Sequence, residues 1–78
     1  MATTELLRKL EEHIVYSAMK FETENGASLI RAAVLYEEAA SISSRLAFYT
    51  NNSGYVKNAK SYLASAKKCW VNSFVGHR

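Results

Sequence analysis

Hydrophobic residues recur along this chain at intervals of three and four, the period at which side chains share one face of an α-helix. In the first segment, the residues that keep this rhythm are Leu7, Leu10, Ile14, Ala18 and Phe21. Thr3 or Thr4 can cap the start of this helix, and Glu5 follows in the first turn, where the helix dipole favours an acid. The pattern predicts a helix over about residues 4–22.

Two polar turns divide the rest of the chain. Asn25-Gly26 is a turn dipeptide, and Ser28 is a suitable cap for the helix that follows it. Residues 50–54 are five turn-forming residues in a row. These breaks predict helices over about residues 29–49 and 55–74. Because short loops make consecutive helices antiparallel, we expect an all-α, up-down-up three-helix bundle.

The second and third helices set small residues against tyrosines on the face expected to point inward. This face consists of Leu29, Ala32, Tyr36, Ala39, Ser43 and Leu46 in the second helix, and of Tyr55, Ala59, Tyr62, Ala66, Cys69 and Trp70 in the third. Alanine lets a neighbouring backbone approach, and tyrosine fills the remaining gap. Faces of this kind suit close helix–helix contact and favour a recognition module over an enzyme.

The composition fits one small helical domain. The chain has 78 residues, no proline and 49% hydrophobic residues, so nothing interrupts a helical backbone, and we expect residues 1–78 to form a single domain. A lone cysteine cannot form an internal disulfide and favours a reduced, cytoplasmic setting. No apolar run approaches the roughly 20 residues of a membrane span, and no leader pattern precedes the first helix. We therefore expect a soluble, unexported chain.

The charges are distributed unevenly along the chain. The net charge is +3, and all seven acids lie at or before Glu38. The charged residues after Glu38 are Arg45, Lys57, Lys60, Lys67, Lys68 and Arg78. This asymmetry has two interpretations: an acidic first helix lies beside a basic third helix within the bundle, or the charge reflects the chemistry of a partner.

Residues that could perform catalysis or hold a metal do not converge. His13 and His77 are the two histidines, and His77 has no second ligand-type residue one helical turn away. The pairs Glu11-Glu12 and Glu37-Glu38 diverge by about 100° around a helix, so we expect both on solvated faces. Cys69 lies on the inward face and is expected to pack there. The sequence predicts no enzyme activity, no metal site and no cofactor.

Apolar residues extend beyond the inward face in the second and third helices. The third helix has Lys57, Lys60, Lys67 and Lys68 opposite its inward face, with Val56, Leu63 and Phe74 between the two faces and Trp70 leaning towards them. The second helix has Leu35, Ile42 and Tyr49 along one shoulder. These arcs are wider than the about 100° that a core helix needs. Either they complete a small core, or a further helix or extended peptide lies in a groove between helices.

These residues resemble the pattern of a microtubule-interacting and transport (MIT) domain. MIT domains are three-helix modules of the AAA ATPases that disassemble ESCRT-III polymers and of other trafficking proteins. The second helix is similar to theirs at Leu29, Ala32, Tyr36 and Ala39, the third at Tyr62-Leu63-Ala64-Ser65-Ala66-Lys67-Lys68, and the first at Ala18 and Glu22. The resemblance covers nearly the whole chain.

The resemblance implies a module that binds short C-terminal motifs of ESCRT-III-type proteins and thereby recruits an ATPase or other trafficking factor to membrane-remodelling polymers. A helical motif would lie between the second and third helices, against Leu63 and its expected neighbours Val56, Lys60, Lys67, Trp70, Ile42 and Leu35. An extended motif would lie between the first and third helices, against Val15 and Met19. The implied location is cytoplasmic, with recruitment to endosomal or division-site membranes through partners.

The third helix departs from the family in its charge. Family members that bind the helical motif often present acids there, whereas the corresponding positions here are Ser65 and Lys67, and residues 55–74 contain no acid. We therefore predict a ligand with acidic residues beside its apolar anchors. The lysines also leave open a basic helical module that binds an anionic membrane surface or nucleic acid, although no recognition-helix signature is present. A steep loss of binding with salt would distinguish phosphate contacts from an apolar groove.

Overall fold

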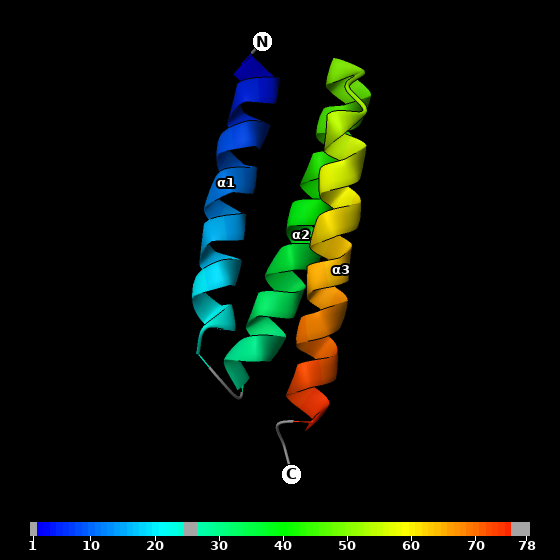
Figure 1. Ribbon diagram of the computed structural model, residues 1–78. Coiled ribbons are helices and arrows are strands. Elements are labelled where there is room, and N and C mark those ends of the chain that lie inside the picture. The colour runs from blue at the N-terminus through cyan, green and yellow to red at the C-terminus, as the bar shows by residue number, and fades with distance from the viewer. Residues whose placement is uncertain (1, 25–26, 76–78) are drawn as a thin grey trace.

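The computed structural model describes residues 2–24 and 27–75 of the chain, which form an all-α bundle of three helices (Figure 1). The helices are α1 (Ala2–Glu22), α2 (Ala27–Thr50) and α3 (Gly54–Val75). Each runs antiparallel to the one before it, which confirms the predicted fold class. None of them, over the described residues, has the length and apolar character needed to cross a membrane.

The helices begin one to two residues earlier than the sequence predicts. Thr3 and Thr4 lie inside the first turn of α1 and not at its cap. Ser28 likewise lies inside α2, and its hydroxyl donates to Glu24 Oε1 at 3.2 Å. Helix ends depend on single caps and turns, so they are less well determined by periodicity than helix faces are.

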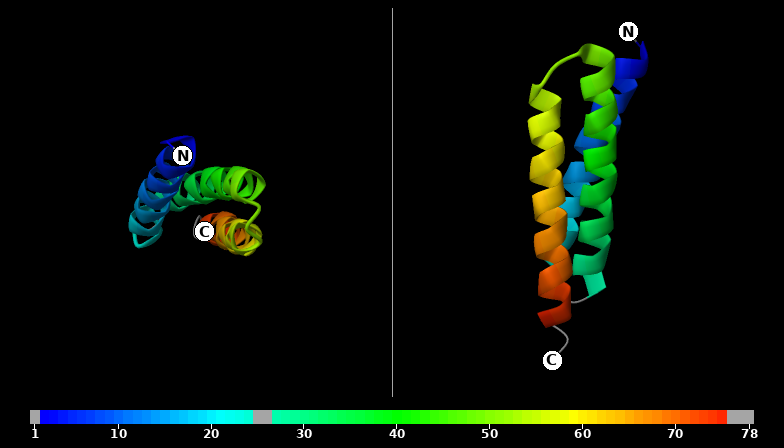
Figure 2. Two further views of the ribbon diagram at one scale, coloured as in Figure 1. Left: turned by 90° about the horizontal axis from the view of Figure 1, so that it is seen from above. Right: turned by 90° about the vertical axis from the view of Figure 1, so that its right-hand side faces the viewer.

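The helix α2 packs against both of its neighbours, whereas α1 and α3 hardly meet each other. The end-on and front views agree that α1 stands apart from α3 while α3 runs alongside α2 (Figures 1 and 2). The Cα atoms extend over 47 × 18 × 12 Å, an elongated and flattened shape. The bundle is therefore two helix pairs that share α2, and α1 and α3 form its open side.

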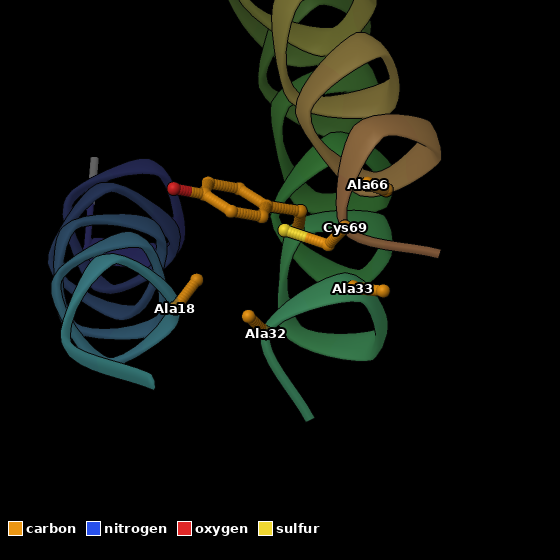
Figure 3. Close-up of a cluster of buried hydrophobic side chains, with 6 residues drawn as sticks. Ala18, Ala32, Ala33, Ala66 and Cys69 are labelled. Carbon is orange, nitrogen blue, oxygen red and sulfur yellow. The ribbon is translucent and has the colours of Figure 1, made fainter. Parts of the chain in front are cut away.

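The interface between α2 and α3 is made of small residues. Ala33 of α2 clusters with Ala66 and Cys69 of α3 (Figure 3), and Ser43 donates from its hydroxyl to the backbone carbonyl of Tyr55 at 2.9 Å. A side chain of α2 can reach the backbone of α3 only because the two helices approach closely. The predicted inward faces of both helices are buried or half-buried, as expected.

The interface between α1 and α2 contains larger side chains at the end formed by the start of α1 and the end of α2. Ile14 of α1 clusters with Ala39, Ile42 and Leu46 of α2, and Leu7 and Val15 pack against this cluster. At the other end, Ala18 and Ala32 point towards each other (Figure 3). Leu10, which follows the same hydrophobic rhythm, is exposed at the edge of α1.

The turn between α2 and α3 is built from asparagines, in the segment where the sequence predicts a break. Asn51 has a φ of 57° and donates its N–H to the carbonyl of Ala47 at 2.8 Å. Asparagine tolerates this left-handed conformation better than most residues, which makes it a natural end for a helix. Asn52 Oδ1 then accepts the N–H of Gly54 at 2.8 Å and caps the start of α3.

Candidate functional site

The outer side of α3 carries an exposed apolar strip. Val56, Leu63 and Trp70 follow one another at intervals of seven residues, and Phe74 lies one turn beyond Trp70. Val56, Leu63 and Phe74 are exposed, and Trp70 is half-buried. Seven residues are almost two helical turns, so this spacing keeps side chains on one side of a helix, as in helices that pack along a neighbouring helix. We call Val56, Leu63, Trp70 and Phe74 the α3 strip.

Two lysines accompany the α3 strip. Lys60 and Lys67 lie four residues after Val56 and Leu63, and both are exposed. Residues four apart are neighbours on a helix surface, so apolar and cationic side chains alternate along this side of α3. Five of the residues that the sequence predicts for a binding site therefore lie together on this side of α3: Val56, Lys60, Leu63, Lys67 and Trp70.

The indole of Trp70 ties the α3 strip to α2. Trp70 Nε1 donates to Glu37 Oε2 of α2 at 2.9 Å. Glu37 is exposed, as its sequence pattern predicts, yet its carboxylate is occupied by this bond. The bond holds the N–H edge of the indole beside α2, so Trp70 lies where the α3 strip meets α2.

Two residues expected beside Leu63 lie elsewhere. Ile42 is only 8% exposed and packs with Ile14 of α1, and Leu35 is half-buried against the same cluster. The prediction that they line a groove between α2 and α3 is wrong, because the apolar shoulder of α2 to which they belong faces α1. A hydrophobic pattern shows that a helix has two shoulders but does not say which neighbour each shoulder meets.

The two residues expected for an extended ligand differ in their accessibility. Val15 is half-buried and packs against the Ile14 cluster, whereas Met19 is exposed. Both belong to α1, on the side of the chain where α1 and α3 hardly meet. Met19 is therefore accessible to a ligand, and Val15 is partly covered by the chain itself.

A shallow pocket of about 360 Å³ lies between the end of α1 and the start of α2 and was missed by sequence analysis. The residues that line it are Phe21, Ile30, Arg31, Val34 and Leu35. The guanidinium carbon of Arg31 lies 5.9 Å from the centre of the Phe21 ring, within cation–π range. The sequence feature that could have indicated this pocket is the four-residue spacing of Ile30 and Val34, which places two apolar side chains together outside the inward face of α2.

Polar side chains occupy the line along which α1 and α3 face each other over α2. Tyr36 of α2 donates its hydroxyl to Glu22 Oε1 of α1 at 2.7 Å. Burial, and then the bond to Glu22, raise the pKa of Tyr36 well above its ordinary value. Burial, and then the charge of Glu11, raise the pKa of Tyr62 of α3. We call Glu11, Glu22, Tyr36, Tyr62 and Cys69 the α1–α3 seam.

The chemistry of Cys69 in this seam agrees with a packing role. Its side chain is buried, and burial, followed by the charge of Glu22, raises the pKa of the thiol. A reactive cysteine needs access and a lowered pKa that favours the thiolate. Cys69 has neither, so it is a buried thiol within the core cluster.

Glu11 contradicts the expectation that both glutamates of its pair lie on a solvated face. Glu12 is exposed, but Glu11 is only 7% exposed. Its Oε2 atom is covered and has no hydrogen-bond partner among the residues that the structure describes. Glu11 lies three residues before Ile14 and seven before Ala18, which places it on the inward side of α1 despite its charge.

The comparisons with known proteins add no relative. No protein-family model, no curated protein and no solved structure matches this chain. Among the residues described, no group of three His, Cys, Asp or Glu side chains is placed to hold a metal ion. The functional proposal therefore rests on the geometry of the chain and on its sequence pattern.

Proposed function

We propose that this chain is a peptide-binding module that holds a short amphipathic helix along the α3 strip. The seven-residue repeat of Val56, Leu63 and Trp70, of which the first two are exposed and Trp70 is half-buried, is the observation that carries the proposal. Apolar side chains in this arrangement are the usual partners of a second helix, whose own apolar residues pack between them. The resemblance to MIT domains suggests the tails of ESCRT-III-type proteins as the source of that helix.

The lysines beside the strip define the charge of the ligand. Lys60 and Lys67 alternate with the apolar positions, so a ligand helix with acids flanking its apolar anchors matches the surface in both respects. Exposed ion pairs contribute about 0.2–1 kcal/mol each, whereas buried apolar anchors dominate most interfaces. The strip therefore supplies most of the affinity, and the lysines supply orientation and preference among ligands.

The test is an amide chemical-shift titration of the chain with two synthetic peptides from ESCRT-III-type tails, one helical and leucine-rich and one extended and proline-containing. The proposal expects saturable shifts around the α3 strip with the helical peptide. Shifts around Met19 with the extended peptide alone would instead assign the ligand to the α1 side. The absence of shifts with either peptide at millimolar concentration would overturn the proposal.

Two variants of α3 test whether the peptide recognises the strip itself or binds any exposed apolar side chain. Leu63 and Val71 are 52% and 51% exposed, but Val71 lies off the strip. Leu63→Ala should weaken binding of the helical peptide about tenfold, the effect of losing one central anchor, whereas Val71→Ala should leave the affinity unchanged. Equal losses in both variants would mean that the peptide does not recognise the strip.

A second matched pair tests the charge of the ligand. Changing Lys60 and Lys67 to Glu should weaken binding of an acid-flanked peptide and flatten its salt dependence. Changing Lys57 and Lys68 to Glu alters the net charge equally, but these lysines lie off the strip, so the affinity should fall less. If vesicles of phosphatidylserine bind the chain with a steep salt dependence while peptides do not, the basic membrane-binding alternative replaces this proposal.

A further inference from the structure

We infer that the α1–α3 seam is a second binding site, which receives the ammonium group of a lysine side chain through the carboxylate of Glu11. The site lies on the side of α3 that faces α1 and is distinct from the α3 strip. It does not depend on which peptide the strip binds. The ligand chemistry is a primary ammonium at the end of a flexible alkyl stem.

The carboxylate of Glu11 is the primary observation. Glu11 Oε2 is covered, and none of the residues described donates a hydrogen bond to it. A buried carboxylate oxygen without a donor is strongly unfavourable, and native proteins pair nearly all such groups. A hydrogen-bond donor from another molecule would remove this unfavourable free energy by pairing with Glu11 Oε2.

The chemistry of a carboxylate selects a cation as that donor, because a charged donor makes the stronger hydrogen bond to it. Glu22 lies about 16 Å along α1 from Glu11 and is paired separately, since its Oε1 accepts the hydroxyl of Tyr36. The unpartnered oxygen of the seam is therefore that of Glu11. The chain's own lysines on α3 are exposed at other positions, where they do not reach Glu11 Oε2.

The packing of the bundle explains how a ligand reaches a covered oxygen. The helices α1 and α3 hardly meet each other, so a ligand that enters between them does not have to separate two closely packed helices. Two of the side chains of this region, Val15 and Tyr62, are only half-buried. Side-chain rotation is easier than movement of a helix, and a lysine can pass its slender stem along apolar side chains while its ammonium reaches the acid.

The test uses n-butylammonium chloride, the analogue of a lysine side chain, added to the isotope-labelled chain. The inference expects a saturable shift of the Glu11 carboxyl carbon and of the Tyr62 ring at millimolar concentration. Tetramethylammonium has the same charge but no N–H donor, so it should produce no saturable shift there. Equal responses to the two cations, or no response to n-butylammonium, would overturn the inference.

A matched pair of variants locates the binding carboxylate. Glu11→Gln and Glu12→Gln change the net charge equally, but Glu12 is exposed. Glu11→Gln should weaken n-butylammonium binding about tenfold or more, the usual effect of losing a charge-assisted hydrogen bond, while Glu12→Gln retains it. If both variants bind as the parent does, the inference is wrong.

Thermal unfolding of the unmodified chain gives a readout that needs no variant. A ligand that binds only the folded state raises Tm, so n-butylammonium should raise it more than tetramethylammonium at equal concentration. The reverse order would contradict the site. Peptide-induced shifts at the α3 strip should be unchanged in Glu11→Gln, so failure of this site and failure of the proposed function are distinguishable.

Discussion

The two sides of α2 show how the size of interfacial side chains decides what a helix pair can do. Towards α3, alanines and serines allow close approach, and Ser43 bonds directly to the backbone of Tyr55. Towards α1, Ile14, Ile42 and Leu46 fill one end of the interface. The α2–α3 pair is closely packed and carries the α3 strip on its outer surface. The helix α1 packs against α2 and hardly meets α3, so the polar side chains of the α1–α3 seam lie between α1 and α3.

This difference teaches that one three-helix bundle can combine two kinds of surface. The α3 strip is apolar with flanking lysines, and the α1–α3 seam is acidic with tyrosines. Both arise because α3 packs closely against α2 and hardly meets α1. Substitutions should therefore act in opposite ways at the two interfaces: truncation should weaken the α1 side, and enlargement should weaken the α3 side.

The largest effect is expected from truncation on the α1 side. Leu46 is fully buried against Ile14, and Leu46→Ala should lower the free energy of unfolding by about 2–5 kcal/mol, because it removes apolar contact and leaves a cavity. Urea unfolding followed by circular dichroism at 222 nm measures the change. Phe48 is largely exposed, so Phe48→Ala is the control and should shift stability by less than about 0.5 kcal/mol. Equal losses would contradict the assigned interface.

Enlargement on the α3 side comes next. Ala66 is buried where α3 meets α2, and Ala66→Leu should lower the free energy of unfolding by about 1–3 kcal/mol, because there is no room for the added carbons. The exposed Ala64 provides the matched substitution Ala64→Leu, which should be near neutral. A chain that tolerates leucine equally at both positions does not have a close α2–α3 interface.

The hydrogen bond across the seam should matter less and should depend on pH. Tyr36→Phe removes the hydroxyl that Glu22 accepts and should lower the free energy of unfolding by about 0.5–1.5 kcal/mol near neutral pH. Tyr16→Phe, at an exposed tyrosine, is the control. Urea unfolding of the three proteins measures both effects.

The direction of the pH effect follows from the raised pKa of Tyr36. Above its ordinary pKa of 10.0, the unfolded chain releases a proton that the folded chain retains, so stability is full below pH 10 and falls as pH rises further. One such group contributes a slope of up to about 1.4 kcal/mol per pH unit. Tyr36→Phe should show a shallower decline than the parent, and an unchanged slope would contradict this role.

The smallest effect is expected at the bond between Trp70 and Glu37. Glu37→Gln changes an exposed acceptor of the indole N–H, so the free energy of unfolding should change by no more than about 0.5 kcal/mol. The Trp70 indole proton should nevertheless shift in the NMR spectrum. Glu38→Gln, at the adjacent exposed acid, should leave that proton unchanged.

Periodicity predicts the helices and their buried faces because burial repeats at every turn. The faces that contain Ala32 and Tyr36 in α2, and Ala59 and Ala66 in α3, are buried as the spacing indicates. The placement of Ile42 could not be predicted in the same way. Its helical spacing places Ile42 beside the inward face of α2. Only the handedness of the bundle decides that this side of α2 packs against α1.

The candidate sites were predicted unevenly for the same reason. Residues Val56, Leu63 and Lys67 belong to one helix, so their spacing alone brings them together. The α1–α3 seam joins residues from three helices, and no local pattern aligns Glu11 with Tyr62. The spacing of Glu11 from Ile14 and Ala18 does mark it as inward-facing, but glutamate is rarely buried without a partner, and this general rule outweighed the spacing.

The burial of Cys69 provides a kinetic probe of how the bundle opens. It is the chain's single cysteine, its side chain is covered, and its raised pKa keeps the thiol protonated. A maleimide can therefore react only with molecules in which the thiol has become exposed. If α1 can detach while α2 and α3 stay paired, labelling proceeds faster than global unfolding. At maleimide concentrations where labelling outpaces reclosing, the reaction rate equals the opening rate and gives the lifetime of the closed seam.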